Sequence, residues 1–419
     1  MIEKSIMNVE ILRSQFPQLS ECVYGKPLVY LDNAATIQRP QSVIDKWVFL
    51  STHKNSNLHR AVHKIAADAT EEYESTRDEI RCFINAAGRE EIIFTSGTTA
   101  SINLLAFCFG EAFVEEGDEI VVSECEHHSN IVPWQMMCER KKAQLKVLPV
   151  DVSGHLRIDL LPELITDRTK LLSVAHISNV LGLVNPIKEI ITYCHSKGCL
   201  VMVDGAQGIV HEKVDVQDLD CDFYAFSGHK LYAAPGTGVL YGKKQYLEAM
   251  PPYMGGGEMI AHVSFNATSY APLPGKFEAG TQNMAGIPTL KPAIQLAELT
   301  RNSCVEASYR KLRDYVLDAL LSDKRISLYG IPRDEKVPRG TSEKIALFSF
   351  CVNGVHHEDL ALILDKMGIA TRSGQMCAEP LMDRFGVSGM LRASFAPYNT
   401  MEEAQYFIAS LNKAIDMLL

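Results

Sequence analysis

A lysine and an aspartate each follow a short apolar segment of the sequence. Lys230 comes four residues after the end of the apolar run 223–226, and Asp204 directly follows the run 200–203. Such runs are typical of buried parallel strands, and open α/β sheets bind ligands beyond the carboxyl ends of their strands. A lysine amine in that position is a candidate for Schiff-base chemistry.

The alternative for an isolated lysine is a solvent-exposed side chain after a turn, because lysine is mostly exposed in folded proteins. Asp204 weighs against this alternative, since solvation does not explain a carboxylate at the end of a buried strand. Pyridoxal phosphate (PLP) requires both groups, a lysine on its aldehyde carbon and a carboxylate on its pyridine nitrogen. The two residues together therefore predict a PLP site.

Two further strand ends carry polar residues. A predicted strand at 91–95 is followed by Ser-Gly-Thr-Thr at 96–99 and then by an apolar helix, whose N-terminus offers backbone N–H groups to a phosphate. A plain helix cap explains one of these hydroxyls equally well. His127 and His128 follow a predicted strand at 119–123, but no third or fourth ligand stands at metal spacing, so we predict no metal site. A single imidazole is enough to stack on a flat cofactor ring.

Other candidates lie in less regular segments. Asn179 follows a predicted strand at 171–177 and can donate to a ring oxygen or to a substrate. His59 and Arg60 fall in a helix-compatible stretch, where such residues are more often solvated or locally paired. Thr281 belongs to a Gly- and Pro-rich region that predicts loops at the cleft or at a subunit contact, and from there it could reach a phosphate.

The order of the elements predicts how these residues are positioned. Helices and strands alternate up to about residue 250, which indicates an α/β fold with a mainly parallel sheet whose strand ends converge on one cleft. Residues 8–20 have helical spacing up to a proline. Beyond about residue 290 a long helical segment leads to strands at 326–329 and 345–351, an α+β unit with Cys377 on a loop and Arg392 on a strand. We predict an N-terminal arm (1–25), a large domain (26–290) and a small C-terminal domain (291–419).

The composition limits the function further. The net charge of -10 argues against nucleic acid as a partner, because phosphate binding needs a basic face. The eleven cysteines show neither metal spacing nor a disulfide framework, which predicts a reducing compartment. No stretch has the character of a signal peptide or of a membrane span. We therefore expect a cytoplasmic protein with no membrane partner.

Several motifs together resemble the cysteine desulfurases, PLP enzymes of fold type I, and among them the SUF-type branch that includes selenocysteine lyase. The resemblance spans nearly the whole chain and rests on the segments 31–36, 97–99, 126–130, 132–134, 178–182, 203–207, 226–230 and 277–281. The short, gapless Arg372-Ser-Gly-Gln-Met-Cys377 is similar to the SUF branch. The resemblance implies a PLP-dependent transferase fold of α/β class, in which the large domain has a mainly parallel sheet of about seven strands.

The resemblance also implies roles for individual residues. Lys230 would hold the cofactor covalently, while His127 stacks on the ring and Asp204 and Gln207 set the charge of the ring. The phosphate would be held by Thr98, Thr99, Ser227 and His229, and by Thr281 of a neighbouring subunit in a homodimer. Arg392 would bind the substrate carboxylate beside Asn179, and Arg372, His59 and Arg60 would complete the substrate site.

The implied reaction converts L-cysteine to L-alanine and transfers the sulfur to Cys377 as a persulfide, and then to a SufE- or SufU-like acceptor for iron-sulfur cluster or other cofactor assembly. Cys377 is the candidate nucleophile, and Arg372 on the same loop would favour its thiolate. The family usually has a histidine close before this cysteine, where Gln375 and Met376 stand here, so we expect no imidazole to assist the thiol. Selenocysteine lyase and cysteine sulfinate desulfinase activity are the alternatives, and a non-catalytic interaction homologue is a third.

Overall fold

The computed structural model describes residues 7–59, 62–301, 303–331 and 343–419. Its centre is a seven-stranded sheet with the order β4-β10-β9-β8-β7-β5-β6. Only β10 runs antiparallel to its neighbours, and the other six strands are parallel. The strands are β4 (Ile92–Thr95), β5 (Glu119–Ser123), β6 (Gln144–Leu148), β7 (Thr169–Ala175), β8 (Leu200–Asp204), β9 (Phe223–Ser227) and β10 (Gly238–Gly242).

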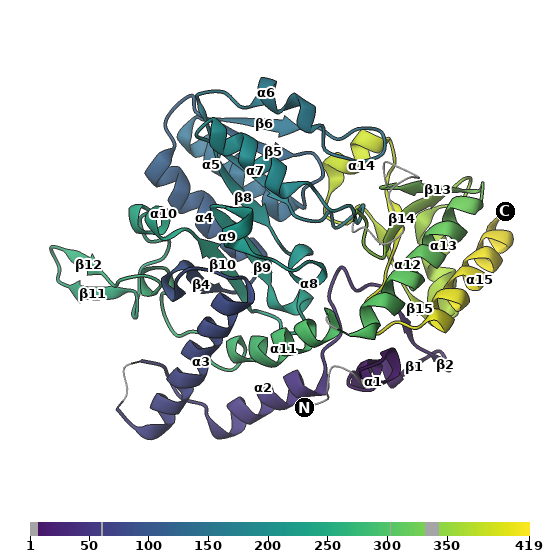
Figure 1. Ribbon diagram of the computed structural model, residues 1–419, viewed down its shortest axis with the longest axis horizontal. Helices are drawn as coiled ribbons and strands as arrows, with labels where there is room; N and C mark the ends of the chain where they lie inside the picture. The colour runs from purple at the N-terminus through teal and green to yellow at the C-terminus, as the bar shows by residue number, and fades with distance from the viewer. Residues whose placement is uncertain (1–6, 60–61, 302, 332–342) are drawn as a thin grey trace.

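The apolar runs of this sheet are continuous because both of its faces are covered. In β9, Phe223 and Ala225 pack into one hydrophobic cluster, whereas Tyr224 and Phe226 pack into another on the opposite face. Helices lie on both sides of the sheet in Figure 1. The helices up to residue 301 are α1 (Val9–Arg13), α2 (Gln41–His53), α3 (Lys64–Phe83), α4 (Thr98–Phe113), α5 (Val132–Lys141), α6 (Leu161–Leu164), α7 (Ile187–Ser196), α8 (Gly208–His211), α9 (Val216–Leu219), α10 (Lys244–Ala249) and α11 (Leu290–Arg301).

The C-terminal part forms a second sheet, with the order β13-β14-β17-β16 and all neighbours antiparallel. It lies to the right of the larger sheet in Figure 1. Its strands are β13 (Ile326–Tyr329), β14 (Leu347–Val352), β16 (Arg372–Gly374) and β17 (Met390–Ser394). The accompanying helices are α12 (Cys304–Ser322), α13 (His357–Lys366), α14 (Glu379–Phe385) and α15 (Met401–Leu418). The division into arm, large domain and small domain remains a prediction.

Short strands connect distant parts of the chain. β3 (Val29–Tyr30) pairs in parallel with β15 (Ile369–Ala370), and Asp32 forms a single bridge to Ser394 in β17. The N-terminal segment thereby reaches the C-terminal sheet before it enters the larger one. Two small hairpin sheets are formed by β1 (Cys22–Val23) with β2 (Lys26–Pro27) and by β11 (Ile260–Val263) with β12 (Thr268–Tyr270).

Two predicted helical stretches differ from the structure. Only Val9–Arg13 of residues 8–20 is α-helical, because Pro17 holds the preceding Phe16 in an extended conformation and begins a separate short 3-10 helix. His59 is not helical: it has a φ of 64°, and helix α3 begins only at Lys64 with His63 as its cap. Among the described residues, no helix is long and apolar enough to cross a membrane.

Candidate active site

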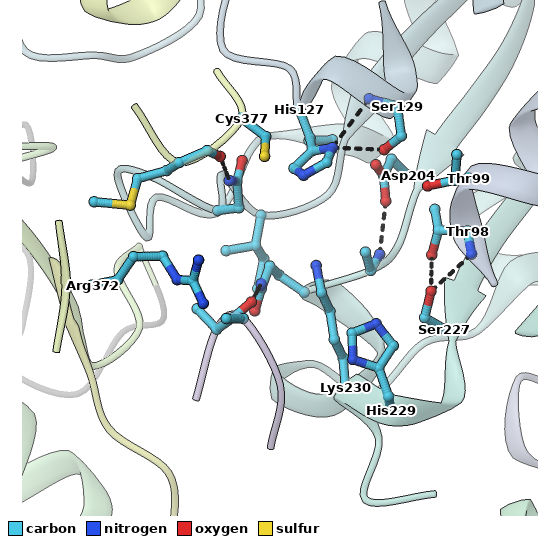
Figure 2. A pocket seen from close by; sticks show the side chains of 18 of the residues that line it. Thr98, Thr99, His127, Ser129, Asp204, Ser227, His229, Lys230, Arg372 and Cys377 are labelled. Carbon is cyan, nitrogen blue, oxygen red and sulfur yellow. Dashed lines mark hydrogen bonds between the residues drawn. The ribbon is translucent and has the colours of Figure 1, made fainter. Parts of the chain in front are cut away.

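A cavity of about 330 Å³ lies at the carboxyl ends of the parallel strands β4, β5, β7, β8 and β9. The remaining wall comes from Ala34 and Ala35 after β3, from β16 and the loop that follows it, and from β17. Figure 2 shows its side chains pointing toward one another from several elements. It gathers twelve of the predicted residues: Thr98, Thr99, His127, Asn179, Asp204, Gln207, Ser227, His229, Lys230, Arg372, Cys377 and Arg392.

Three predicted residues are not among those that line this cavity. His59 is paired with Glu74, its Nε2 lying 3.2 Å from Oε1 of the glutamate. Thr281 lines a different hollow, together with Tyr253 and Phe277. Arg60 lies outside the described residues. The roles proposed for these three therefore remain predictions.

Asp204 ends strand β8, and Lys230 ends the short 3-10 helix Gly228–Lys230 that follows the adjacent strand β9. Asp204 is the last residue of β8 and is 5% exposed, and its Oδ1 accepts a hydrogen bond of 2.9 Å from the backbone of Ala206. Burial raises the pKa of Asp204. Burial also lowers the pKa of Lys230, although the Asp204 charge partly opposes this shift. A lysine with a lowered pKa has more of the neutral amine that attacks an aldehyde.

The N-terminus of helix α4 lines another part of the cavity with Thr98 and Thr99. Thr98 is the first residue of this 16-residue helix, and its backbone N–H donates a 2.8 Å hydrogen bond to Oγ of Ser227. The Thr98 and Ser227 hydroxyl oxygens are also 2.8 Å apart. Gly97 has a φ of 150°, and a Cβ built on Gly238 would lie only 2.4 Å from the Gly97 Cα. These two glycines let β10 approach the loop closely. The helix N-terminus that follows, with the hydroxyls beside it, can face an anion.

His127 is held as a neutral imidazole. Its Nδ1 accepts a 3.1 Å hydrogen bond from the Ser129 backbone N–H and lies 2.7 Å from the Ser129 hydroxyl (Figure 2). Because Nδ1 is the acceptor, the ring proton is on Nε2. Burial, reinforced by Lys230, lowers the His127 pKa to about 4. The neutral ring can stack on a cofactor, and its Nε2–H can donate a hydrogen bond.

The loop that carries Cys377 is held by His128, which follows β5, and by Asn179, which follows β7. Met376 and Cys377 have φ values of 54° and 55°, the left-handed region that residues other than glycine seldom adopt. The Cys377 carbonyl accepts a 2.7 Å hydrogen bond from the His128 backbone, and the Met376 carbonyl accepts one of 2.9 Å from the Asn179 amide. The Asn179 amide thus holds the cysteine loop, and its predicted contact with a ring oxygen or a substrate remains a prediction.

The model of the family described as aminotransferase class-V matches residues 29–407. The chain belongs to this family. Family members depend on PLP, so the predicted fold type and cofactor are confirmed.

Proteins similar to this class-V chain include a probable cysteine desulfurase of Vibrio cholerae, which is 45% identical over 99% of this chain and 100% of its own. A cysteine desulfurase of Pectobacterium carotovorum is 44% identical over 97% of both chains. The crystal structure of the Escherichia coli cysteine desulfurase CsdA has a TM-score of 0.89 at 39% identity, covering 99% of this chain and 100% of that one. The SUF-type branch remains a prediction.

The side chains that line the cavity match the chemical groups of PLP. A half-buried amine, a buried carboxylate and a hydroxyl-lined helix N-terminus match the aldehyde, ring nitrogen and phosphate of the cofactor. Lys230, Asp204 and Thr98 supply these groups, and His127 supplies the stacking ring. Among the described residues, no other side chain forms a hydrogen bond or ion pair with Lys230 Nζ, so the amine is available to the aldehyde.

Sequence reasoning missed three residues that support the site. Ser129 sets the His127 tautomer, and Asp32 forms ion pairs with two arginines of the cavity. Glu126, which is completely buried, accepts hydrogen bonds from the Asn130 amide at 2.7 Å and the Ala175 backbone at 2.8 Å. Glu126 is one residue and Ser129 two residues from His127 in the sequence, and this proximity was the signal that could have identified them. For Asp32, the only signal in the sequence was its place in a polar loop.

Proposed function

We propose that this chain is a PLP-dependent cysteine desulfurase that converts L-cysteine to L-alanine and receives the sulfur on Cys377. One observation carries the proposal: the same cavity is lined by Lys230 and Asp204 for the cofactor and by Cys377 and Arg392 for the substrate. The names of the similar proteins support the same reaction.

The cofactor end prepares the substrate for bond cleavage. Bound PLP supplies an electron sink for the carbon atoms of the substrate. Lys230 would hold the cofactor, and as a free neutral amine it would accept the α-proton of the substrate. His127, with its proton on Nε2, would stack on the ring, and the Asp204 carboxylate would keep the ring nitrogen protonated. Arg392, which is 2% exposed, binds the carboxylate of the substrate.

The sulfur step uses Cys377. Its thiolate attacks the sulfur of the substrate, so that a sulfur–sulfur bond forms while the carbon–sulfur bond breaks. The carbon takes up a proton, for which the Lys230 ammonium formed by removal of the α-proton is the available donor. L-cysteine and the enzyme thiol thus become L-alanine and an enzyme persulfide, with no external oxidant or reductant. Cys377 is exposed, so the terminal sulfur can pass to a protein acceptor that carries a thiol.

We also propose that the enzyme acts in the cytoplasm as a homodimer. Thr281 does not line the cavity of its own chain, so it would reach a cofactor phosphate only from a second copy. Helix α2 carries the exposed apolar side chains Trp47, Val48 and Phe49, which a second copy would cover. Sedimentation analysis should give a dimer that keeps its activity, and a fully active monomer would contradict this assembly.

The activity is tested with the purified PLP-loaded protein, L-cysteine and a thiol reductant. We expect L-alanine and sulfide in equal amounts, because the reductant releases the persulfide sulfur. Selenocysteine and cysteine sulfinate are measured in parallel at equal concentrations. A protein that binds PLP but forms no alanine from L-cysteine would contradict the proposal.

A further inference from the structure

The cavity contains two arginines that are direct neighbours in the C-terminal sheet. Arg372 in β16 and Arg392 in β17 are Cα partners across an antiparallel pair of strands. Side chains of such partners lie on the same face of a sheet, and like charges there destabilise each other. Both arginines line the cavity, and both interact electrostatically with Cys377. The site therefore needs a counter-charge close to the two guanidinium groups.

Asp32 supplies this counter-charge to both arginines at once. Its carboxylate accepts hydrogen bonds from Arg372 Nε at 3.0 and 3.1 Å and from Arg372 Nη2 at 2.7 Å. It also accepts one of 3.2 Å from Nη2 of Arg392. The bridge between Asp32 and Ser394 fixes its backbone, and its side chain is 15% exposed. The arginine–aspartate–arginine cluster thus has one net positive charge.

One positive charge matches a substrate with a single carboxylate. After the α-carboxylate has bound, a substrate with a thiol brings no further anion to this end of the cavity. A sulfinate side chain would bring a second anion, and an anion without a free cation is costly to bury. Arg372 lines the cavity but is occupied by Asp32, so it is not free to neutralise such a group.

We propose that Asp32 is a specificity-determining residue: it acts through Arg372 and Arg392 to favour substrates with a neutral thiol side chain over those with an anionic sulfinate. The inference rests on the proposed function. Asp32 is not among the residues that line the cavity. It positions the two arginines and sets their net charge, and it takes no part in bond cleavage.

The substitution Asp32→Asn tests the charge while keeping the size of the side chain. The measured quantity is kcat/KM for cysteine sulfinate divided by kcat/KM for L-cysteine, with alanine as the common product. We expect this ratio to rise by about tenfold, a moderate change because the Arg372 side chain is 46% exposed and its charge is partly screened. A purely structural role would lower both values together, and an unchanged or lower ratio would overturn the proposal.

A matched control removes an equivalent ion pair elsewhere. Arg325 donates to the carboxylate of Asp323 at 3.0, 3.1 and 2.7 Å, the same distances as in the Arg372–Asp32 pair, and neither residue lines the cavity. Asp323→Asn should leave the ratio unchanged. The double variant Asp32→Asn with Arg372→Gln restores one net positive charge and should return the ratio to within about twofold of wild type. A ratio that stays high in the double variant would contradict the proposal.

Binding without turnover separates this inference from the proposed function. Titration calorimetry on the PLP-loaded enzyme compares L-alanine with L-aspartate, whose side chain carries a second anion. Asp32→Asn should strengthen aspartate binding relative to alanine binding by about tenfold. If wild type forms no alanine, the proposed function fails, and this binding ratio still tests Asp32. If wild type forms alanine and the binding ratio of Asp32→Asn equals that of wild type, the inference alone fails.

Discussion

The cofactor side of the cavity and its sulfur side are built in different ways. On the cofactor side, Asp204, Ser227 and Lys230 come from the ends of two adjacent parallel strands, β8 and β9. On the sulfur side, Arg372 and Asp32 are 340 positions apart in the chain and meet where the N-terminal segment joins the C-terminal sheet. The cofactor side thus depends on one sheet, whereas the sulfur side depends on contacts between distant segments.

This difference suggests a division of labour. The buried strand ends hold groups with shifted pKa values in place, which suits a cofactor that stays bound through many turnovers. The sulfur side carries an exposed thiol on a loop, which suits a group that must meet a second protein. Variants on the two sides should therefore fail in different ways.

The largest effect is expected on the cofactor side, from Lys230→Ala. Alanine formation should fall more than about a thousandfold, because both the covalent link and the proton acceptor are lost. Borohydride reduction followed by mass spectrometry should find no cofactor attached to the chain. Lys188→Ala, which removes an exposed lysine paired with Asp218, is the control and should behave like wild type. Retained turnover in the Lys230 variant would contradict the assignment.

On the sulfur side, Cys377→Ala should leave cofactor binding intact. L-cysteine desulfuration should fall at least about a hundredfold, because the attacking thiolate is gone. Part of the activity on selenocysteine should remain, since selenium leaves carbon with less nucleophilic help. Absorbance spectra report the cofactor, and alanine assays report both reactions. Cys22→Ala, at another exposed cysteine, should change neither; equal losses with both substrates would count against the role given to Cys377.

A smaller loss is expected for Asp204→Asn on the cofactor side. The amide keeps the shape of the carboxylate but not its charge, so the ring nitrogen loses its counter-ion and kcat should fall by about ten- to a hundredfold. The thiol of Cys377 should keep its alkylation rate, because it belongs to the other side of the cavity. A variant that loses thiol reactivity together with kcat would show that the two sides are not independent.

The smallest effect concerns acid stability, in which the two sides also differ. Burial lowers the pKa of His229 to about 4, so the unfolded chain binds a proton first as the pH falls below about 6.5. The stability contribution of His229 is complete above that pH and is lost between about pH 6.5 and 4. His229→Gln should therefore reduce the loss of unfolding free energy between pH 7 and 5, by about 1 kcal/mol after allowance for partial exposure.

The control for this measurement is Arg372→Gln on the sulfur side. A guanidinium does not titrate in this range, so the variant should have the same pH dependence as wild type in denaturant unfolding of the cofactor-free protein. The interpretation fails if His229→Gln steepens the acid loss, or if Arg372→Gln changes it by the same amount.

The cofactor side could be predicted from the sequence because its signals are local. The apolar runs before Asp204 and Lys230 are strands β8 and β9, and the Gly-Thr-Thr segment begins helix α4. Each of these depends on neighbouring residues, which a single sequence displays. Family membership and fold type, predicted from the motifs taken together, are confirmed by the comparisons.

The rest depends on contacts that no local pattern records. The pairing of β3 with β15 and the ion pairs of Asp32 join the two ends of the chain. Strand β10 lies antiparallel between β4 and β9, and this position depends on how all the strands of the sheet pair, not on the residues near β10. The left-handed backbone at Cys377 is imposed by hydrogen bonds from Asn179 and His128, since the residue types themselves disfavour it.

The most direct test of the account locates the sulfur atom after a single turnover. The PLP-loaded enzyme receives one equivalent of L-cysteine, is blocked with an alkylating probe and is digested for mass spectrometry. We predict one added sulfur on Cys377 in wild type, and no added sulfur on any cysteine in Lys230→Ala, because the cofactor side must act first. Added sulfur on another cysteine, or alanine formed with no persulfide on Cys377, would contradict the account.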